Sequence, residues 1–210
     1  MEPGDKHDDD YTRPIHARYV DPCEMVWLST ATRLGIHIRR SPLVFSATDG
    51  SGRLQLSTRD DLDPDDCLAQ MLLHEICHWC TNGKETYGER DWGFALDGPV
   101  DWREHAALRL QAWLADQVQM RTMFAPTGDF RQYFDRIPDD PLAPLDSSEW
   151  EQSVVQRAAE AIERIQQPPW DPHVLIAMKA TAQIRATITP FAGEYASQLA
   201  EDPLPSLWII

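Results

Sequence analysis

The fold is decided by one stretch of the sequence, DPDDCLAQMLLHEICHWCTNG, which covers residues 63–83. It opens on Asp63 and Pro64 with further acidic residues behind them, which are usual signals for the first turn of a helix. It closes on Asn82-Gly83, a usual helix ending. The residues in between are mostly apolar. The stretch therefore predicts a largely buried helix from residue 63 to about residue 81.

Three polar residues inside this helix, His74, Glu75 and His78, form a His-Glu-x-x-His motif. Histidines four residues apart share a helix face, with Cβ atoms about 6 Å apart, so both imidazoles can reach one ion. Glu75 lies about 100° around the helix from His74. There it would hydrogen-bond a metal-bound water and not bind the metal itself. Buried polar groups need partners, and a metal supplies one. The alternative is two ordinary core histidines and a surface glutamate.

A third ligand is expected from the acidic and histidine residues that follow the motif. These are Glu85, Glu89, Asp91, Asp97, Asp101, Glu104 and His105. A second long helix is predicted over about residues 99–123, and on its helical wheel Glu104 and Gln111 fall within the apolar arc. The opposite side, which we expect to face solvent, carries His105, Arg109 and Asp116. A glutamate in an apolar arc needs a compensating charge, so Glu104 is the predicted ligand and His105 the weaker candidate.

Glu104 also has an alternative interpretation, because Asp101-x-x-Glu104 resembles a capping box at the start of a helix. If Glu104 is a ligand, His74, His78 and Glu104 form a set of two histidines and one carboxylate with open coordination positions. Such a set suits catalytic Zn²⁺ or non-haem Fe(II), and the residues alone do not distinguish the two metals. We expect one divalent metal ion.

The rest of the sequence predicts an α+β fold: a mostly helical single domain with a small sheet, and a zincin-like metal site between two helices. Further helices are predicted over about residues 24–34, 148–166 and 173–188, with a short one ending near 201. Alternating apolar residues and turn glycines predict a small sheet with a hairpin, with strands near 36–39, 43–47 and 53–57. Residues 1–13 are acidic and polar and are expected to be disordered. Residues 14–210 are expected to form the single metal-binding catalytic domain.

Composition limits the partners and the compartment. The 210 residues carry a net charge of −15, which argues against nucleic acid or an anionic membrane surface and favours a basic or neutral substrate. No apolar stretch approaches the 18 residues that a membrane span needs, and the start has no secretory signal. We therefore expect a cytoplasmic protein. Its cysteines, Cys23, Cys67, Cys77 and Cys80, should be reduced, packed thiols. The alternative is a redox role for Cys77 or Cys80.

A longer pattern around the motif resembles the elongation factor P hydroxylase family. It comprises His74-Glu-Ile-Cys-His-Trp-Cys80, Gly83-Lys84, Asp91-Trp-Gly-Phe94 and Asp97-Gly98. The step from Arg103-Glu104 to Gln111-Ala112 is similar too, which supports Glu104 as a ligand. The close similarity covers about residues 74–113. The chain departs from the family at Ala95-Leu96, where the family has a longer stretch rich in tyrosine and tryptophan, and in a shorter link from residue 98 to residue 104.

The resemblance implies a metal-dependent monooxygenase that hydroxylates a modified lysine on elongation factor P. It thus favours Fe(II) over zinc and a protein substrate similar to a translation factor. His74, His78 and Glu104 would bind the metal, and Glu75 would shape the proton environment beside it. The substrate pocket could be lined by Trp79, Asp91, Trp92 and Phe94, although apolar packing is the favoured role for each of the aromatic residues. If the missing aromatic residues shape the pocket in the family, the substrate can differ here although the metal ligands carry over.

Two other functions fit the same residues. In a zinc metallopeptidase, Glu75 would be the general base for a metal-bound water. A strand of the hairpin at residues 43–57 could then pair with an extended peptide. In a non-catalytic protein, the metal would serve structure or binding only. The hydroxylase is the leading hypothesis.

Overall fold

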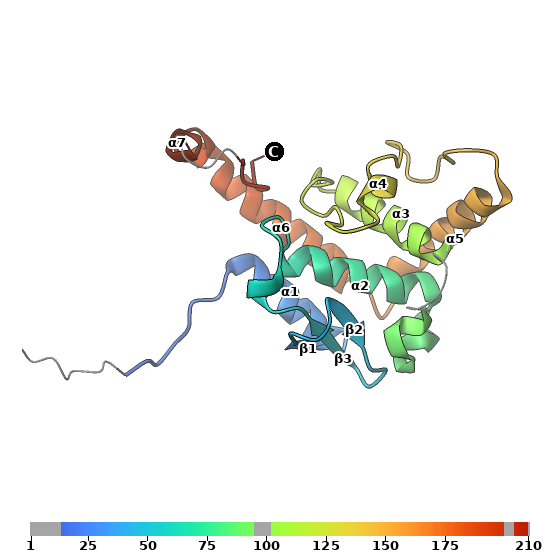
Figure 1. Cartoon of the computed structure of the whole chain (residues 1–210), viewed down its shortest axis with the longest axis horizontal. Helices are drawn as coiled ribbons and strands as arrows, with labels where there is room; N and C mark the ends of the chain where they lie inside the picture. Colours follow the sequence, from blue (N-terminus) through green and yellow to red (C-terminus); the bar gives the residue numbers. More distant parts are fainter. Residues whose placement is uncertain (1–13, 95–101, 200–203, 210) are drawn as a thin grey trace, which may run out of the picture.

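The computed structural model describes residues 14–94, 102–199 and 204–209, and these are mostly helical (Figure 1). The α-helices are α1 (Pro22–Arg33), α2 (Leu68–Asn82), α3 (Trp102–Asp116), α4 (Arg131–Phe134), α5 (Glu149–Ile165), α6 (His173–Ile188) and α7 (Ala192–Gln198). The strands are β1 (His37–Arg40), β2 (Ser46–Thr48) and β3 (Arg53–Leu56). Short 3₁₀ helices are η1 (Arg59–Asp61), η2 (Lys84–Gly88), η3 (Arg90–Gly93) and η4 (Thr189–Phe191). The prediction of a mostly helical domain with a small sheet is confirmed, whereas the N-terminal stretch predicted to be disordered lies outside the described residues.

The strands of the described residues form one sheet in the order β1-β3-β2. β2 and β3 are antiparallel, with Ser46 opposite Leu56, so the predicted hairpin is confirmed. β1 pairs in parallel with the other side of β3. Leu54 and Leu56 are fully buried, which anchors the central strand to the helical core. β2 is therefore an edge strand, and it lies beside η3.

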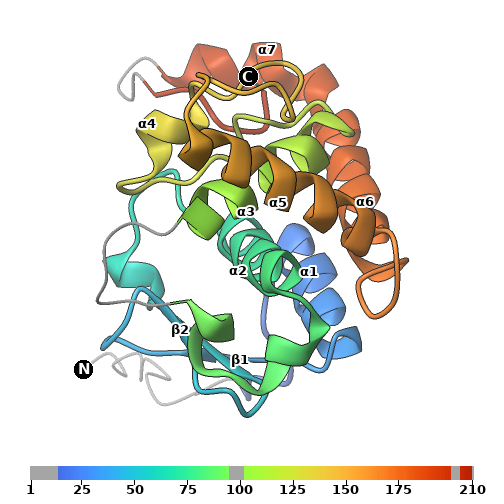
Figure 2. The same cartoon turned by 90° about the vertical axis from the view of Figure 1, so that its right-hand side faces the viewer.

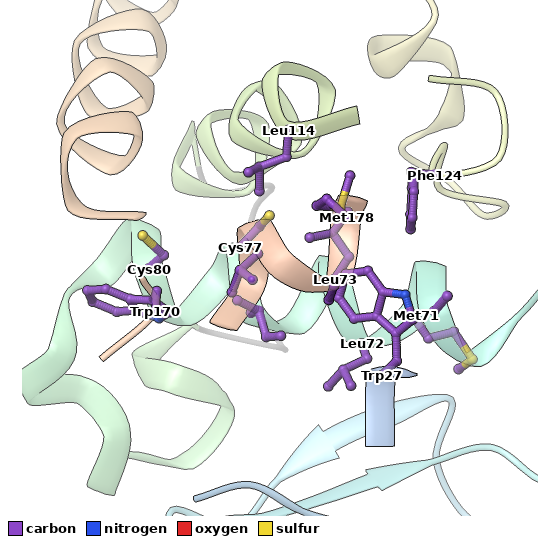
Figure 3. Packing of buried hydrophobic residues seen from close by; sticks show 14 of the residues in the cluster. Trp27, Met71, Leu72, Leu73, Cys77, Cys80, Leu114, Phe124, Trp170 and Met178 are labelled. Atoms are coloured by element: carbon purple, nitrogen blue, oxygen red, sulfur yellow. The ribbon is translucent and has the colours of Figure 1, made fainter. Parts of the chain in front are cut away.

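Helix α2 runs through the middle of the molecule and is buried along most of its length (Figures 1 and 2). α1 packs against it on the side of the sheet, and α3 and α5 pack against it on the other side. Figure 3 shows the contacts that result: Leu72 and Leu73 lie near Trp27 of α1, and Cys77 lies near Leu114 of α3. Each such side chain stabilises the fold by about 1.5–3 kcal/mol when fully buried. One continuous cluster of buried residues joins the sheet to α1, α2, α3, α5 and α6, as a single domain requires.

The predicted start of α2 at Asp63 is wrong by five residues, because the helix begins at Leu68. Asp63 and Asp66 form a separate turn: the Asp66 carboxylate accepts from the Asp63 amide at 2.9 Å, and the Asp66 amide donates back to the Asp63 carbonyl. The Cys67 thiol then caps the helix by accepting from the amide of Gln70. The predicted ending is confirmed at Asn82, followed by a glycine with φ of 105°.

The four cysteines are free thiols packed into the fold. Burial raises the pKa of Cys23 to about 12, and it also raises the pKa of Cys77 and of Cys80. Burial also raises the pKa of Cys67, which is the least buried. Such thiols are poor nucleophiles, which favours the packing interpretation over a redox role.

Helix α3 is buried on both sides, which overturns one prediction. The face expected to be solvated carries Arg109, which is 0% exposed, and His105, which is 9% exposed. Arg109 donates to Glu151 of α5, to the Tyr133 hydroxyl and to two backbone carbonyls of residues 141–143. The His105 ring packs edge-on against Tyr133, with ring centroids 4.0 Å apart. The wheel misjudged this face because α5 and the connection before it cover it.

The end of α3 also differs from the prediction. The helix stops at Asp116 and not near residue 123. Gln119 adopts a left-handed φ of 56°, and Met120 donates its amide to the Ala115 carbonyl, so the chain turns back there. In the described part of the chain, no helix combines the length and apolarity needed to cross a membrane.

Candidate metal centre

The three predicted metal ligands meet between α2 and α3. The Nε2 atom of His74 lies 3.4 Å from one carboxylate oxygen of Glu104, and that of His78 lies 2.9 Å from the other. One ligand atom from each residue falls within 4.8 Å of the others. Among the described residues, no other group of three or more His, Cys, Asp or Glu side chains meets this condition. The sequence thus located the candidate centre correctly, and Glu104 is its third member.

The state of the buried atoms fits a metal ion. His78 Nε2 and Glu104 Oε1 are buried, yet neither makes a contact with hydrogen-bond geometry. A buried polar atom that makes no hydrogen bond costs about 1–3 kcal/mol, and a bound cation would remove this cost. Burial raises the pKa of Glu104, but His78 and His74 lower this pKa by a larger amount. The net shift of the pKa is downward, so the carboxylate is charged. A buried anion that faces two imidazoles can hold one divalent cation, and this ligand set does not decide which metal.

Glu75 is also buried, contrary to the alternative that places it at the surface. One of its carboxylate oxygens accepts from the Ser46 hydroxyl of β2 at 2.7 Å. The other accepts from the Trp92 indole N–H at 2.9 Å. Glu75 therefore ties α2 to the edge strand and to η3, and its orientation beside the motif histidines is fixed from both sides.

The segment that reaches Glu75 has an unusual backbone. Asp91 and Trp92 have φ values of 49° and 54°, in the left-handed region that residues other than glycine rarely adopt. Strain of this kind costs about 1–3 kcal/mol per residue and clusters at functional sites. Two hydrogen bonds hold the segment: the Thr48 amide donates to Asp91, and the Asn82 side chain donates to the Trp92 carbonyl. The strained turn directs the Trp92 indole at Glu75.

The four residues proposed to line a pocket have different positions. Phe94 stacks on the imidazole of His78, with centroids 4.3 Å apart, so it borders the metal centre. Trp92 and Asp91 support Glu75 and β2 as described above. Trp79 is buried and packs on Trp92 and Trp170, so its position matches the packing interpretation.

The other candidate ligands lie elsewhere or outside the described residues. Glu85 and Glu89 are exposed, and His105 is buried against Tyr133. Asp97 and Asp101 lie outside the described residues, and with Asp101 so does the capping-box alternative.

Gln111 is a site residue whose role the sequence interpretation missed. Its side-chain oxygen lies 2.8 Å from Nδ1 of His74. The wheel had placed Gln111 in the apolar arc with Glu104 without assigning it a function. The available signal was the spacing, because residues seven apart lie two helical turns apart on the same face.

The chain matches no family model, no curated protein and no solved structure. The resemblance to the elongation factor P hydroxylases therefore rests on the motif residues between positions 74 and 113.

The metal-free protein should lose stability as the pH rises from about 6.5 to 9. Burial lowers the pKa of His74, but its contacts with Glu104 outweigh burial and raise the pKa to about 9. An unfolded histidine titrates near 6.5, so protonated His74 stabilises the fold fully below that pH, and this contribution disappears as the pH approaches 9. The expected loss is of the order of 3 kcal/mol in the free energy of unfolding.

Urea denaturation of chelator-treated protein at several pH values measures this loss. The Glu104→Gln variant is the control, since without the carboxylate the pKa of His74 should fall and the pH dependence in this window should shrink. A wild-type profile that stays flat between pH 6.5 and 9 contradicts the prediction.

Proposed function

We propose that the chain is a metal-dependent hydroxylase that acts on a protein side chain, in the manner of the elongation factor P hydroxylases. The observation that carries the proposal is the buried group of two histidines and one carboxylate, in which His78 Nε2 and Glu104 Oε1 make no hydrogen bond of regular geometry. Structural zinc sites usually have four protein ligands, whereas catalytic sites keep positions open. Among the described residues this group supplies three. Two histidines and one carboxylate are also the ligands of non-haem Fe(II) oxygenases.

The residues have distinct roles in this proposal. His74, His78 and Glu104 would hold Fe(II), which supplies oxygen activation: one oxygen atom enters a C–H bond of the substrate, and the other leaves as water with two electrons from an external donor. Glu104 offsets part of the metal charge in a buried setting. Phe94, stacked on His78, fixes that ring and offers an apolar surface beside the centre.

The charge of the molecule supports a basic protein substrate. A net charge of −15 attracts cationic partners over distances longer than direct contacts. A lysine-bearing translation factor would suit this field, and it is the substrate class that the resemblance implies.

A zinc metallopeptidase fits the hydrogen bonds around the motif less well. The general base of such an enzyme must face the metal-bound water, but both carboxylate oxygens of Glu75 accept hydrogen bonds from β2 and η3, which direct the carboxylate toward those elements. The edge of β2 that an extended peptide would use is also partly occupied, because the Thr48 amide donates to Asp91. These contacts favour Glu75 as a positioned support of the centre.

Iron loading under anaerobic conditions tests the proposal. We expect the ferrous protein to bind nitric oxide and to give the electron paramagnetic resonance signal of a high-spin iron–nitrosyl centre. With oxygen, ascorbate and elongation factor P bearing its modified lysine, we expect a mass increase of one oxygen atom on the substrate. Protein that retains stoichiometric zinc and stays inert with iron and oxygen would overturn the hydroxylase.

The Glu75→Gln variant separates the two candidate enzymes. A hydroxylase should retain metal and measurable oxygen-dependent turnover, since the ligands are unchanged. A peptidase should lose turnover almost completely with its general base. Peptide hydrolysis by the wild-type zinc form that disappears in Glu75→Gln would favour the peptidase.

A further inference from the structure

Gln111 is a fully buried amide in the middle of α3, and both ends of its side chain are bonded. Its oxygen lies 2.8 Å from Nδ1 of His74. Its nitrogen donates to the backbone carbonyl of Phe124. An apolar residue of similar size would pack here without desolvating an amide, so packing alone does not account for a glutamine.

The contact with Phe124 fixes which way the amide points. A backbone carbonyl can only accept a hydrogen bond, so the NH₂ group of Gln111 must face Phe124. The side-chain oxygen must therefore face His74, and since this oxygen can only accept, the proton of the imidazole must sit on Nδ1. In the neutral imidazole that a metal ligand requires, a proton on Nδ1 leaves the lone pair on Nε2, the atom that lies next to Glu104.

The carbonyl that fixes the amide is itself held in place. The Phe124 ring is fully buried and packs on Trp27, with centroids 5.7 Å apart, as Figure 3 shows for the two residues. The Phe124 amide donates to the carbonyl of Met120. Arg121 bonds to Asp116 and to carbonyls of residues 137 and 138, which clamps the turn after α3. The acceptor is therefore part of a rigid segment.

We infer that Gln111 is a positioning residue of the metal centre, which fixes the tautomer and the ring orientation of His74 so that Nε2 presents its lone pair to the metal. The inference rests on the proposed metal binding, but not on the hydroxylase reaction. Partners of this kind typically change metal affinity by 10–100-fold when they are removed.

Two substitutions separate positioning from packing. Gln111→Met keeps the size but removes both hydrogen bonds. Gln111→Glu keeps an oxygen acceptor for His74, but it replaces the donor to Phe124 with a second oxygen and adds a negative charge. We expect Gln111→Met to weaken zinc binding by about 10–100-fold, measured by competition with a chromophoric chelator. Gln111→Glu should bind zinc more tightly than Gln111→Met, although both lose the same bond to Phe124.

Nuclear magnetic resonance of the zinc-loaded protein gives a second measurement. The Nδ1–H proton of His74 should exchange slowly with water in the wild type and in Gln111→Glu, and rapidly in Gln111→Met. The control is Gln166→Met at the C-cap of α5, which also removes an amide-to-carbonyl bond, here to Ile162, and should leave zinc affinity unchanged.

Each outcome decides one question. Gln111→Met binding zinc as tightly as the wild type would overturn the inference. Equal weakening in Gln111→Met and Gln111→Glu would assign the effect to the bond with Phe124 and would also overturn it. Failure of the wild type to bind zinc or iron would instead refute the metal centre itself.

Discussion

Glu104→Gln is expected to weaken the binding of zinc and ferrous iron by about a thousandfold or more. The amide keeps the shape of the side chain but removes the only acidic ligand between two imidazoles. Breaking a buried charge pair by removing one partner costs about 3–5 kcal/mol, and about 4 kcal/mol corresponds to a thousandfold change in affinity. Metal analysis after anaerobic purification, followed by chelator competition, measures the loss.

Glu85→Gln provides the matched control for this prediction. Glu85 belongs to the same set of acidic candidates in the sequence, but it is exposed on η2. Its replacement should leave metal content and affinity unchanged. If Glu104→Gln retains a full equivalent of tightly bound metal while its circular dichroism matches the wild type, Glu104 is not a ligand.

Arg109→Met should lower the free energy of unfolding by about 3–5 kcal/mol. Arg109 is fully buried and ion-paired with Glu151, which is also buried. Methionine fills much of the space, but Glu151 is then left as a buried charge with only the Leu145 amide and the Tyr133 hydroxyl as partners. Urea denaturation monitored by tryptophan fluorescence measures the change.

Two further variants control for this effect. Replacing both partners, by Arg109→Met with Glu151→Leu, should recover part of the loss, because no unpaired charge remains. Arg157→Met removes a partly exposed ion pair with Glu160 on α5 and should cost less than about 1 kcal/mol. A loss from Arg109→Met as small as that from Arg157→Met would show that the buried pair adds little.

Local patterns in the sequence predicted which residues form the candidate metal centre, because much of its geometry is local. The two histidines are four positions apart, so any regular helix places them on the same face. Glu104 was found because its charge conflicts with the apolar arc around it. The helix predicted over residues 148–166 is also confirmed, and its start is local: the Ser148 side chain accepts from the amide of Glu151 and caps α5.

Long-range contacts explain what the sequence did not predict. Nothing in α3 itself shows that α5 will cover Arg109, since the partners lie 24 to 42 residues away. The contact of Trp92 with Glu75 depends on a left-handed backbone at residues 91 and 92, where asparagine or glycine would be the usual signal. At Asp63 the strong start signal describes a real turn, but the turn closes on itself before the helix begins.

Helix α3 contributes to two separate groups of buried polar residues, with Glu104 and Gln111 on one face of the helix and Arg109 on the opposite face. Because one helix carries both, we expect an ion bound by Glu104 to favour the docking of α5 on Arg109, and the docking of α5 to favour binding of the ion. Removing the metal should therefore lower the free energy of local opening of α5 and of the connection over residues 126–148. Protease resistance in that connection would then report metal occupancy from the far side of the helix.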